Sequence, residues 1–405
     1  MATVGREVAI VDEELVPVVR ASTAHPAADP NYHHMIEFFT NQTDECWSNT
    51  TMPSMKSAAR LDFIRQVVDR DPRKFSWTGN AFNYLASNRR ISFDKSNIRT
   101  STYRPFTRNV LNFASELDER RYKQPRLFPD PEAENLVICV TDKTSTAPFS
   151  ALMCREVPSL HLFGAGNATK CYPRYIYAAE VHDSEASLFE VQSEARQHGV
   201  TDRAHLSVQS QLGAKLTKDD VFYYVYGILH SVEYRTAFAA DFRKDVPRIP
   251  YVTDPADFRA FAMSGRMLAD LHLDYESIDP WSELEIEYSA KFNSDSPASY
   301  RVEKMKYAKT GRETDRTTII YNSNITISNI PLEAHDYTVG SKSALDWIVE
   351  RYQVKTDKDS GIVNDPNDWA KEHDDPTYIF DLVRRIVTVS MRTNEIVAGL
   401  PSLNL

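Results

Sequence analysis

The fold of this chain is decided by residues 217–251, TKDDVFYYVYGILHSVEYRTAFAADFRKDVPRIPY. Acidic residues open the stretch, where the positive end of a helix dipole favours them. Two prolines near its end interrupt the helical pattern. Between these limits apolar residues recur on one helix face, at Val221, Tyr224, Val225, Ile228 and Leu229. The stretch therefore predicts a helix with one buried side.

Further helices are expected on both sides of this stretch. Asp254 is expected to cap a second long helix, with Pro255 in the first turn. Ser341 or Ser343 is expected to cap a helix around Leu345 and Ile348. Helical spacing of apolar residues predicts the helices at 54–70, 79–90, 254–275, 343–353 and 377–397.

Two regions, 135–180 and 300–330, carry short β-rich runs bounded by turn-forming residues. With the helices they predict an α+β fold, in which a small mixed or antiparallel β-rich region packs on a helical scaffold. We expect an N-terminal segment at 1–94, a β-rich part at 95–213 and a mainly helical part at 214–405, with a β insertion near 300–330.

Three segments have weaker patterns. REVAIV at 6–11 predicts a short strand, and the polar residues 181–213 predict a linker or an excursion. FGAGNATK at 163–170 contains two of the three glycines of a dinucleotide-binding turn, but no helix with a downstream acidic residue follows. A flexible loop that could still approach a phosphate or a base edge is the favoured interpretation there.

The composition is that of an ordinary globular protein, with 42% hydrophobic and 26% charged residues. No apolar run reaches the ~18 residues of a membrane span, and the N-terminus lacks the pattern of a secretory signal. We therefore expect a cytoplasmic protein. The four cysteines form no close pair of the kind that binds zinc, and they are expected to be reduced. No metal site is expected at the pair His33–His34.

Charge is segregated along the chain. Residues 89–126 contain ten basic and four acidic side chains, a net charge of +6, although the whole chain carries −10. The remainder therefore carries −16. A basic stripe on an acidic protein can bind phosphates while the acidic remainder suppresses indiscriminate association.

The basic region includes RTSTYRPFTRN at 99–109, which has two interpretations. In the structural one, Pro105 fixes a turn, Tyr103 and Phe106 fill a core, and the arginines extend to water. In the functional one, the arginines contact guanine and phosphate groups. The residues alone leave both open.

No catalytic motif is complete in this sequence. YTVGSKSAL at 337–345 lacks the first glycine of a phosphate-binding P-loop. IDPWSE at 278–283 lacks the second proline of the loop with which amino-methyltransferases grip a flipped base. The acidic pairs at 219–220 and 374–375 lie at expected helix starts, where they cap. The sequence predicts no catalytic residue and no metal site.

Several stretches resemble the C-terminal specificity domain of type ISP restriction-modification enzymes, which join a nuclease, a helicase-like ATPase, an adenine methyltransferase and a target-recognition domain in one chain. The resemblance spans residues 95–397, and residues 1–94 resemble only weakly the segment that follows the methyltransferase. The pieces that carry it are STYRPFTRNVLNF (101–113), APFSALMCREVPSLHLFG (147–164), CYPRYIYA (171–178), residues 217–251, FAMSGRMLADLHLDYE (261–276), residues 321–369 and YIFDLVRRIVTVSMRTNEIV (378–397).

The resemblance implies sequence-specific recognition of double-stranded DNA, with methyltransferase and helicase domains or subunits as partners. ATP, Mg²⁺ and S-adenosylmethionine are then expected only in the upstream parts of the parent enzyme, and no cofactor in this chain. Cations of 89–126 would dock on phosphates, loops of 141–174 would face base edges, and the helices would pack against the methyltransferase. The residues expected to contact DNA are Arg89, Arg90, Arg99, Arg104, Arg108, Lys143, Thr144, Ser145, Arg155, Asn167, Lys170 and Arg174.

Two other functions fit the sequence. One is a protein-interaction or scaffold component of an anti-phage system, which would bind no duplex in preference to another. The second is part of an adenine-specific DNA methyltransferase, which the missing base-gripping loop disfavours. The DNA target sequence and the oligomeric state cannot be derived from the residues.

Overall fold

The computed structural model describes residues 29–405 except 72–73, 76, 93, 119–120, 179–195, 214, 359–360, 362 and 404. In the first helix, side chains are described from Met35 onward. The strand expected at 6–11 and the side chains of the pair His33–His34 lie outside these residues. The described residues form helices and several small sheets, which confirms the predicted α+β fold.

The expected central helix is α5 (Lys218–His230). Its N-terminus is closed by a reciprocal pair: the Thr217 hydroxyl accepts from the Asp220 amide, and the Asp220 carboxylate accepts from the Thr217 amide. The helix ends earlier than the pattern suggested, because Ser231 has extended backbone and caps a separate short helix, α6 (Val232–Ala237).

Helix α7 (Pro255–Leu273) begins as predicted, with the Asp254 side chain accepting a hydrogen bond from the Ala256 amide. It packs on α5 at unusually short range, and two glycines permit this. A Cβ atom on Gly265 would lie 1.9 Å from the carbonyl oxygen of Tyr223, and one on Gly227 would lie 2.3 Å from that of Phe261. Any larger side chain at these positions would force the helices apart.

A buried polar chain connects α5 and α7 to the last helix, α10 (Tyr378–Ala398). The Tyr226 hydroxyl accepts from the Met153 amide (2.8 Å) and lies 2.7 Å from His272 Nδ1, while His272 Nε2 lies 3.0 Å from the Thr393 hydroxyl. Burial lowers the pKa of His272 to about 3. One nitrogen of the neutral ring accepts a hydrogen bond and the other donates one, so His272 bridges Tyr226 and Thr393 and joins three helices and one strand.

The β-rich region contains a three-stranded antiparallel sheet, ordered β4-β3-β6, and a second sheet ordered β2-β1-β5. Cys139 and Cys171 face each other across β3 and β6, and all four cysteines are free and buried. The run SLHLF at 159–163, expected as a strand, forms a turn instead. The strands are β1 (Ile98–Arg104), β2 (Thr107–Asn112), β3 (Val137–Thr141), β4 (Ala151–Cys154), β5 (Val157–Pro158), β6 (Thr169–Pro173), β7 (Tyr175–Tyr177) and β8 (Arg196–His198).

The N-terminal part is helical. Helix α1 (Asp29–Trp47) was not expected, whereas α2 (Ser57–Val67) and α3 (Gly79–Ala86) confirm the predicted pair. The supposed linker at 181–213 contains another helix, α4 (Asp202–Leu212), within its described portion. Burial of Ala204, Val208 and Leu212 explains that helix, because its apolar residues recur at helical spacing between polar ones.

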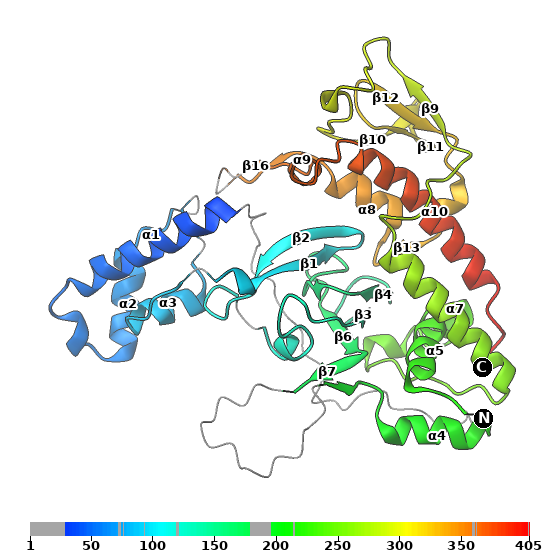
Figure 1. Cartoon of the computed structure of the whole chain (residues 1–405), viewed down its shortest axis with the longest axis horizontal. Helices are drawn as coiled ribbons and strands as arrows, with labels where there is room; N and C mark the ends of the chain where they lie inside the picture. The colour runs from blue at the N-terminus through cyan, green and yellow to red at the C-terminus, as the bar shows by residue number, and fades with distance from the viewer. Residues whose placement is uncertain are drawn as a thin grey trace.

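The predicted β insertion is a four-stranded sheet ordered β10-β11-β12-β9, which lies above helix α8 in Figure 1. Ser343 caps α8, as expected, by accepting from the Asp346 amide. The remaining elements are β9 (Glu285–Tyr288), β10 (Lys306–Thr310), β11 (Glu313–Ile320), β12 (Ile325–Ser328), β13 (Thr338–Val339), β14 (Lys342–Ser343), α8 (Ala344–Arg351), β15 (Lys355–Thr356), β16 (Val363–Asn364), α9 (Asn367–Glu372) and the 3-10 turns at 52–54, 95–97, 124–126, 241–243, 297–299 and 332–335.

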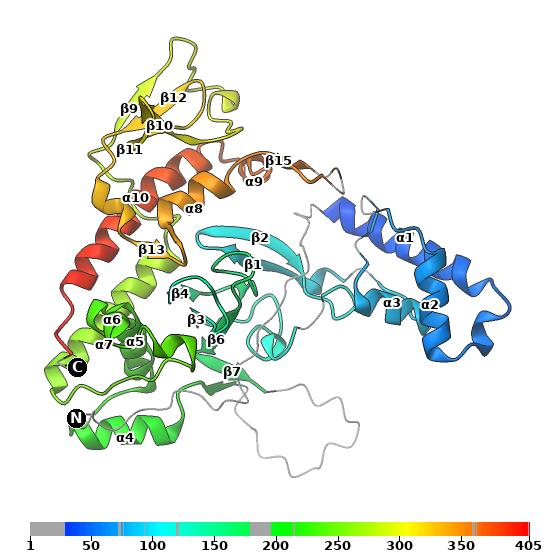
Figure 2. The ribbon, with the colours of Figure 1, turned by 180° about the vertical axis from the view of Figure 1, so that it is seen from behind.

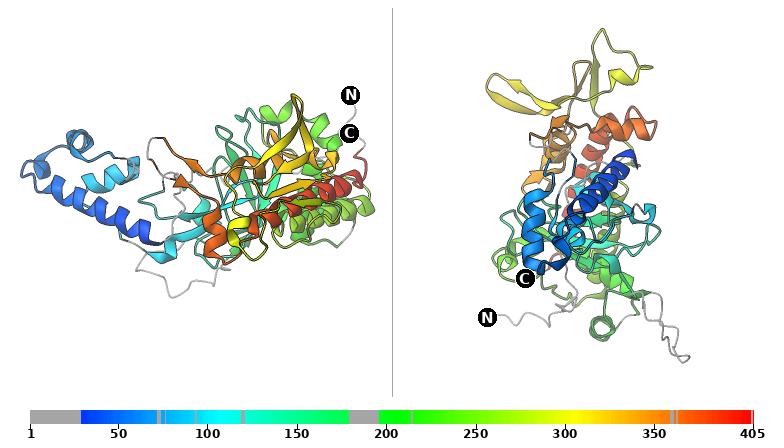
Figure 3. Two further views of the ribbon diagram at one scale, coloured as in Figure 1. Left: turned by 90° about the horizontal axis from the view of Figure 1, so that it is seen from above. Right: turned by 90° about the vertical axis from the view of Figure 1, so that its left-hand side faces the viewer.

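The elements are arranged around the β1–β2 hairpin and the β4-β3-β6 sheet. Figures 1 and 2 show helices α1–α3 on one side of these strands and α4, α5 and α7 on the other. Seen from above in Figure 3, the blue α1–α3 part projects away from the rest. The proposed division of the chain at 94/95 and 213/214 stays a prediction.

An ion triad fixes the β1–β2 hairpin to the scaffold. Arg108 on β2 pairs with Glu156, before β5, at 3.0 Å, and with Glu276, just after α7. Thr102 donates to Glu156 (2.9 Å) and Tyr378 to Glu276 (2.7 Å). Burial by itself lowers the pKa of Arg108, but the Tyr275 hydroxyl and the two carboxylates raise it, so the guanidinium is charged. Four segments distant in sequence therefore meet at one cation.

The glycine contact predicts a specific loss of stability. Gly265→Ala should lower the free energy of unfolding by about 3 kcal/mol, at the upper end of overpacking costs, because the new methyl group collides with backbone. Gly399→Ala is the matched control, since a Cβ there would lie 3.6 Å from the carbonyl oxygens of Glu395 and Ile396, at ordinary contact distance. Urea denaturation of both variants measures the difference, and equal stabilities would contradict the close packing of α5 on α7.

The triad predicts that Arg108 stabilises the fold and does not contact DNA. Arg108→Ala leaves Glu156 and Glu276 mostly buried and uncompensated, so the free energy of unfolding should fall by about 3–5 kcal/mol. Arg155→Ala breaks the exposed pair with Asp274 and should cost at most about 1 kcal/mol. Urea denaturation compares the two. An Arg108→Ala protein with wild-type stability and weakened DNA binding would make Arg108 a DNA contact instead of a tether.

Candidate nucleic-acid interface

The loop between β3 and β4 gathers polar side chains in a fixed shape. We call residues 142–147 the presentation loop. Asp142 organises its first turn: its Oδ1 accepts from the Lys143 amide (2.7 Å), its Oδ2 from the Thr144 hydroxyl (3.2 Å), and its carbonyl from the Ser145 amide (2.9 Å). Lys170 on β6 lies 3.5 Å from the same carboxylate. The turn is therefore held by its own first residue.

Asn167 fixes the second half of the presentation loop. This side chain is buried, and its Oδ1 accepts from the Ser145 hydroxyl (2.8 Å), the Thr146 amide (3.0 Å), the Thr146 hydroxyl (3.2 Å) and the Ala147 amide (3.1 Å). Gly164 and Gly166 precede it with positive φ angles of 117° and 77°, which place Asn167 under the loop. The glycines that resembled a cofactor fingerprint thus serve a turn that anchors the loop.

The ordered loop leaves several polar groups facing solvent. Lys143, Thr144 and Thr146 are exposed, while Ser145, Asn167 and Lys170 are partly or fully buried beneath them. An ammonium and two hydroxyls supply hydrogen-bond donors and acceptors of the kind that base edges require. The structure therefore brings together five of the predicted contact residues: Lys143, Thr144, Ser145, Asn167 and Lys170.

The arginines of the β1–β2 hairpin are largely engaged inside the protein. Arg99 is buried, donates to the Pro129 carbonyl (3.1 Å) and lies over the Phe113 ring. Arg104 is buried, donates to the Tyr103 carbonyl (2.7 Å) and stacks 4.1 Å from the Tyr103 ring centre. Phe106 fills the core at the hairpin turn, as the structural interpretation expected, but the arginines do not extend freely to water.

The other predicted cations lie on separate elements. Arg89 is exposed after α3 and stacks on Tyr84, and Arg90 beside it pairs with Asp44. Arg155 pairs with Asp274 at 2.6 Å near the end of α7.

Arg174, between β6 and β7, donates from Nε to Asp219 (2.8 Å), which also binds His198 (3.0 Å). Burial by itself raises the pKa of the Asp219 carboxyl, but its hydrogen bonds to Arg174 and His198 lower it overall. Asp219 is therefore ionised at neutral pH, and Arg174 is held against it.

The twelve predicted residues thus form one compact group at the presentation loop, one internal group in the hairpin, and scattered pairs. Their contact with DNA stays a prediction. The sequence analysis assigned no role to a group of cations around the C-terminal end of α8: Lys304, Lys342, Arg351 and Lys355. Lys304 is 38 residues before Lys342 in the sequence, and no local motif joins it to the other three.

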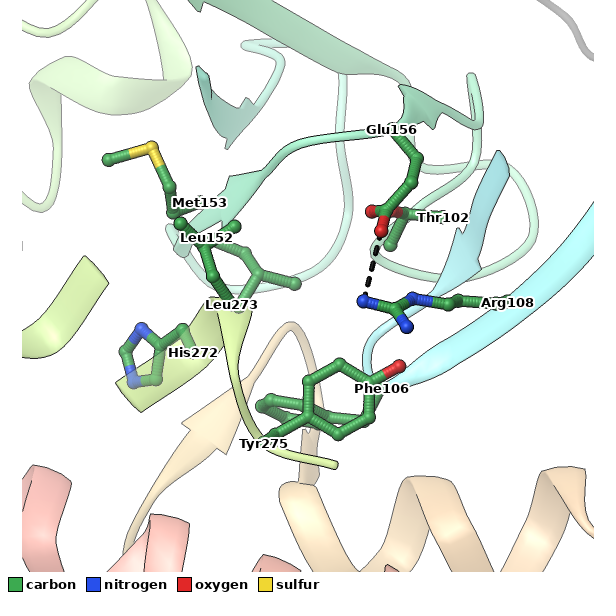
Figure 4. Close-up of a pocket in the computed structure, with 9 residues that line it drawn as sticks. All are labelled: Thr102, Phe106, Arg108, Leu152, Met153, Glu156, His272, Leu273 and Tyr275. Atoms are coloured by element: carbon green, nitrogen blue, oxygen red, sulfur yellow. Dashed lines mark hydrogen bonds and ion pairs between the residues drawn. The ribbon is translucent and has the colours of Figure 1, made fainter. Parts of the chain in front are cut away.

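A small cavity lies beside the ion triad (Figure 4). Its volume is about 10 Å³, enough for roughly one water molecule and too little for a nucleotide or S-adenosylmethionine. Arg108 and Glu156 face each other across it, with the rings of Phe106 and Tyr275 below in Figure 4. Nine residues line it: Thr102, Phe106, Arg108, Leu152, Met153, Glu156, His272, Leu273 and Tyr275.

The described residues contain no cluster of three or more His, Cys, Asp or Glu side chains arranged to hold a metal ion. In the same part of the chain, none of the helices combines the length and apolar character needed to cross a membrane.

The solved structures similar to this chain include three type ISP or DNA-bound proteins. A nuclease-deletion mutant of the Type ISP restriction-modification enzyme LlaGI, in complex with a DNA substrate mimic, is 33% identical with a TM-score of 0.73, covering 92% of this chain and 31% of that one. The ATP-dependent Type ISP enzyme LlaBIII bound to DNA is 28% identical with a TM-score of 0.77, covering 96% and 23%. A DrdV–DNA complex is 25% identical with a TM-score of 0.76, covering 96% and 36%.

The chain spans only about a quarter to a third of the length of these neighbours. No curated protein is significantly similar to it in sequence. Residues 29–382 match the family described as the Type ISP C-terminal specificity domain, which is most of the chain. The chain therefore belongs to the Type ISP C-terminal specificity domain family.

Proposed function

We propose that this chain recognises a specific sequence in double-stranded DNA for a type ISP restriction-modification system and has no catalytic activity of its own. The observation that carries the proposal is the presentation loop, whose backbone amides and hydroxyls are held by hydrogen bonds to Asn167 and Asp142, while the Lys143 side chain faces solvent. The family match and the DNA-bound neighbours support the ligand.

Rigidity matters because sequence discrimination depends on fixed geometry. A flexible loop would lose conformational entropy on binding and could adapt to several base pairs. Each base pair presents a distinct set of donors, acceptors and methyl groups in the major groove. Lys143 and Thr144, fixed at the tip of the presentation loop, are the side chains we assign to base edges.

The chain would act together with other parts of a larger enzyme. The chain spans 31% of the length of its LlaGI neighbour, so we propose that methyltransferase and helicase parts supply the chemistry. These parts would bind ATP, Mg²⁺ and S-adenosylmethionine. The whole system would act in the cytoplasm. On the scaffold, Met263 and Met267 are 65% and 50% exposed one helical turn apart on α7. An apolar face of this kind suits packing against such a part.

Selection from a randomised duplex pool at moderate salt tests the proposal. The wild-type chain should enrich one motif. Lys143→Ala should bind that motif with about 1–3 kcal/mol less affinity and should accept other bases at a single position, because one base contact is lost. A flat pool with the wild-type chain would contradict sequence recognition and favour the scaffold function.

Asn167 provides a matched pair for the same assay. Asn167→Ala removes the acceptor of four hydrogen bonds, so the loop should become mobile and discrimination should weaken at several positions. Asn167→Asp keeps an oxygen acceptor and should retain the motif. Hydrogen exchange of the Thr146 and Ala147 amides reports loop order independently, and rapid exchange in wild type would remove the basis of the proposal.

A further inference from the structure

The C-terminal end of α8 collects cations from four segments. Lys342 lies on β14, Arg351 ends α8, Lys355 lies on β15, and Lys304 pairs in an isolated antiparallel bridge with Gln353. Because Lys355 is two residues beyond Gln353, it faces the same side of this ribbon as Lys304. We call Lys304, Lys342, Arg351 and Lys355 the α8 cationic cluster.

The hairpin tip touches the same place. The Tyr352 hydroxyl, one residue beyond α8, donates to the Phe106 carbonyl at 3.2 Å. Burial lowers the pKa of Arg104 overall; Tyr103 and Glu350 raise it, and the charge of nearby Arg351 lowers it. The cluster therefore has a fifth cation at its inner edge, the guanidinium that the sequence had marked as a DNA contact.

Two of the four cations in the cluster form ion pairs within the protein. Glu350 binds Lys342 with one oxygen and Arg351 with the other. Among the described residues, Lys304 and Lys355 have no ion-pair partner, although both are exposed. Burial lowers the pKa of Lys355, and Arg351, Lys342 and Lys304 add to that effect more than Glu350 offsets it. Repulsion between these cations is therefore left uncompensated in the free protein.

Uncompensated repulsion is costly, and an anion from outside would relieve it. Lys304 and Lys355 are exposed, which suits contact with an extended charged backbone. The cluster also adjoins the anchor of the presentation loop: Lys342 and Arg351 lie 4.9 Å and 5.9 Å from the centre of the Trp347 ring. A Cβ on Gly164 would lie 3.6 Å from that ring and 3.3 Å from Asn167 Nδ2.

We propose that the α8 cationic cluster binds phosphate groups of the duplex whose bases the presentation loop recognises. This inference rests on the proposed function and adds a second, sequence-independent contact surface to it. Lys304 and Lys355 make the direct contacts, while Lys342 and Arg351, shared with Glu350, set the local field. Each phosphate neutralised releases condensed counterions, so the cluster contributes affinity that falls with salt.

The test measures DNA affinity of the full chain at a series of salt concentrations. Lys304→Gln/Lys355→Gln should lower the slope of log affinity against log salt by about 1.8, since each phosphate contact contributes about 0.9. The loss should be equal for the selected motif and for a scrambled duplex, because phosphates carry no sequence information. Thermal stability should not fall, since the substitutions remove repulsion.

Arg203→Gln/Arg259→Gln is the matched control. It removes the same charge from exposed positions on α4, which lies apart from α8 in Figures 1 and 2, and near the start of α7, and should leave the slope unchanged. An unchanged slope in the cluster variant, with the motif still selected, would overturn the cluster while leaving the proposed function intact. A wild-type chain that binds no duplex would overturn both, and an equal slope change in both variants would reduce the effect to net charge.

Discussion

The guanidinium of Arg108 between Glu156 and Glu276 is the interaction on which the arrangement of this protein depends. A mostly buried cation needs its carboxylates, and each carboxylate is in turn bonded to Thr102 or Tyr378. The β1–β2 hairpin, the β4–β5 turn and the ends of two scaffold helices must therefore meet at one point. This meeting also holds the hairpin turn beside the end of α8, where the Tyr352 hydroxyl donates to the Phe106 carbonyl.

The cations discussed above fall into two groups, one that stabilises the fold and one that faces solvent. Arg99, Arg104 and Arg108 of the β1–β2 hairpin bind carbonyls, rings and carboxylates inside the protein, where removal would leave buried groups unpaired. Lys143, Lys304 and Lys355 face solvent and are free to meet DNA. A basic stretch of sequence therefore does not guarantee a basic surface, because tertiary contacts bury some of its cations or pair them with internal groups.

Local signals explain which features the sequence predicted well. The caps of α5, α7 and α8 and the buried side of α5 depend on neighbours within one or two turns. The role of Asn167 depends on a loop twenty residues earlier, and the α8 cationic cluster joins Lys304 to Lys355 through a strand pairing. Such contacts leave no local pattern. The same limit applied to Arg99 and Arg104, because a sequence does not tell an exposed arginine from one bonded to a carbonyl.

The most direct test of this account is a structure of the chain bound to the duplex that it selects. We predict that Lys143 and Thr144 lie within hydrogen-bond distance of base edges, that phosphates lie beside Lys304 and Lys355, and that Arg108 keeps both of its carboxylates. A complex in which the presentation loop is remote from the DNA, or in which Arg108 has left Glu156 and Glu276 to contact it, would contradict the account.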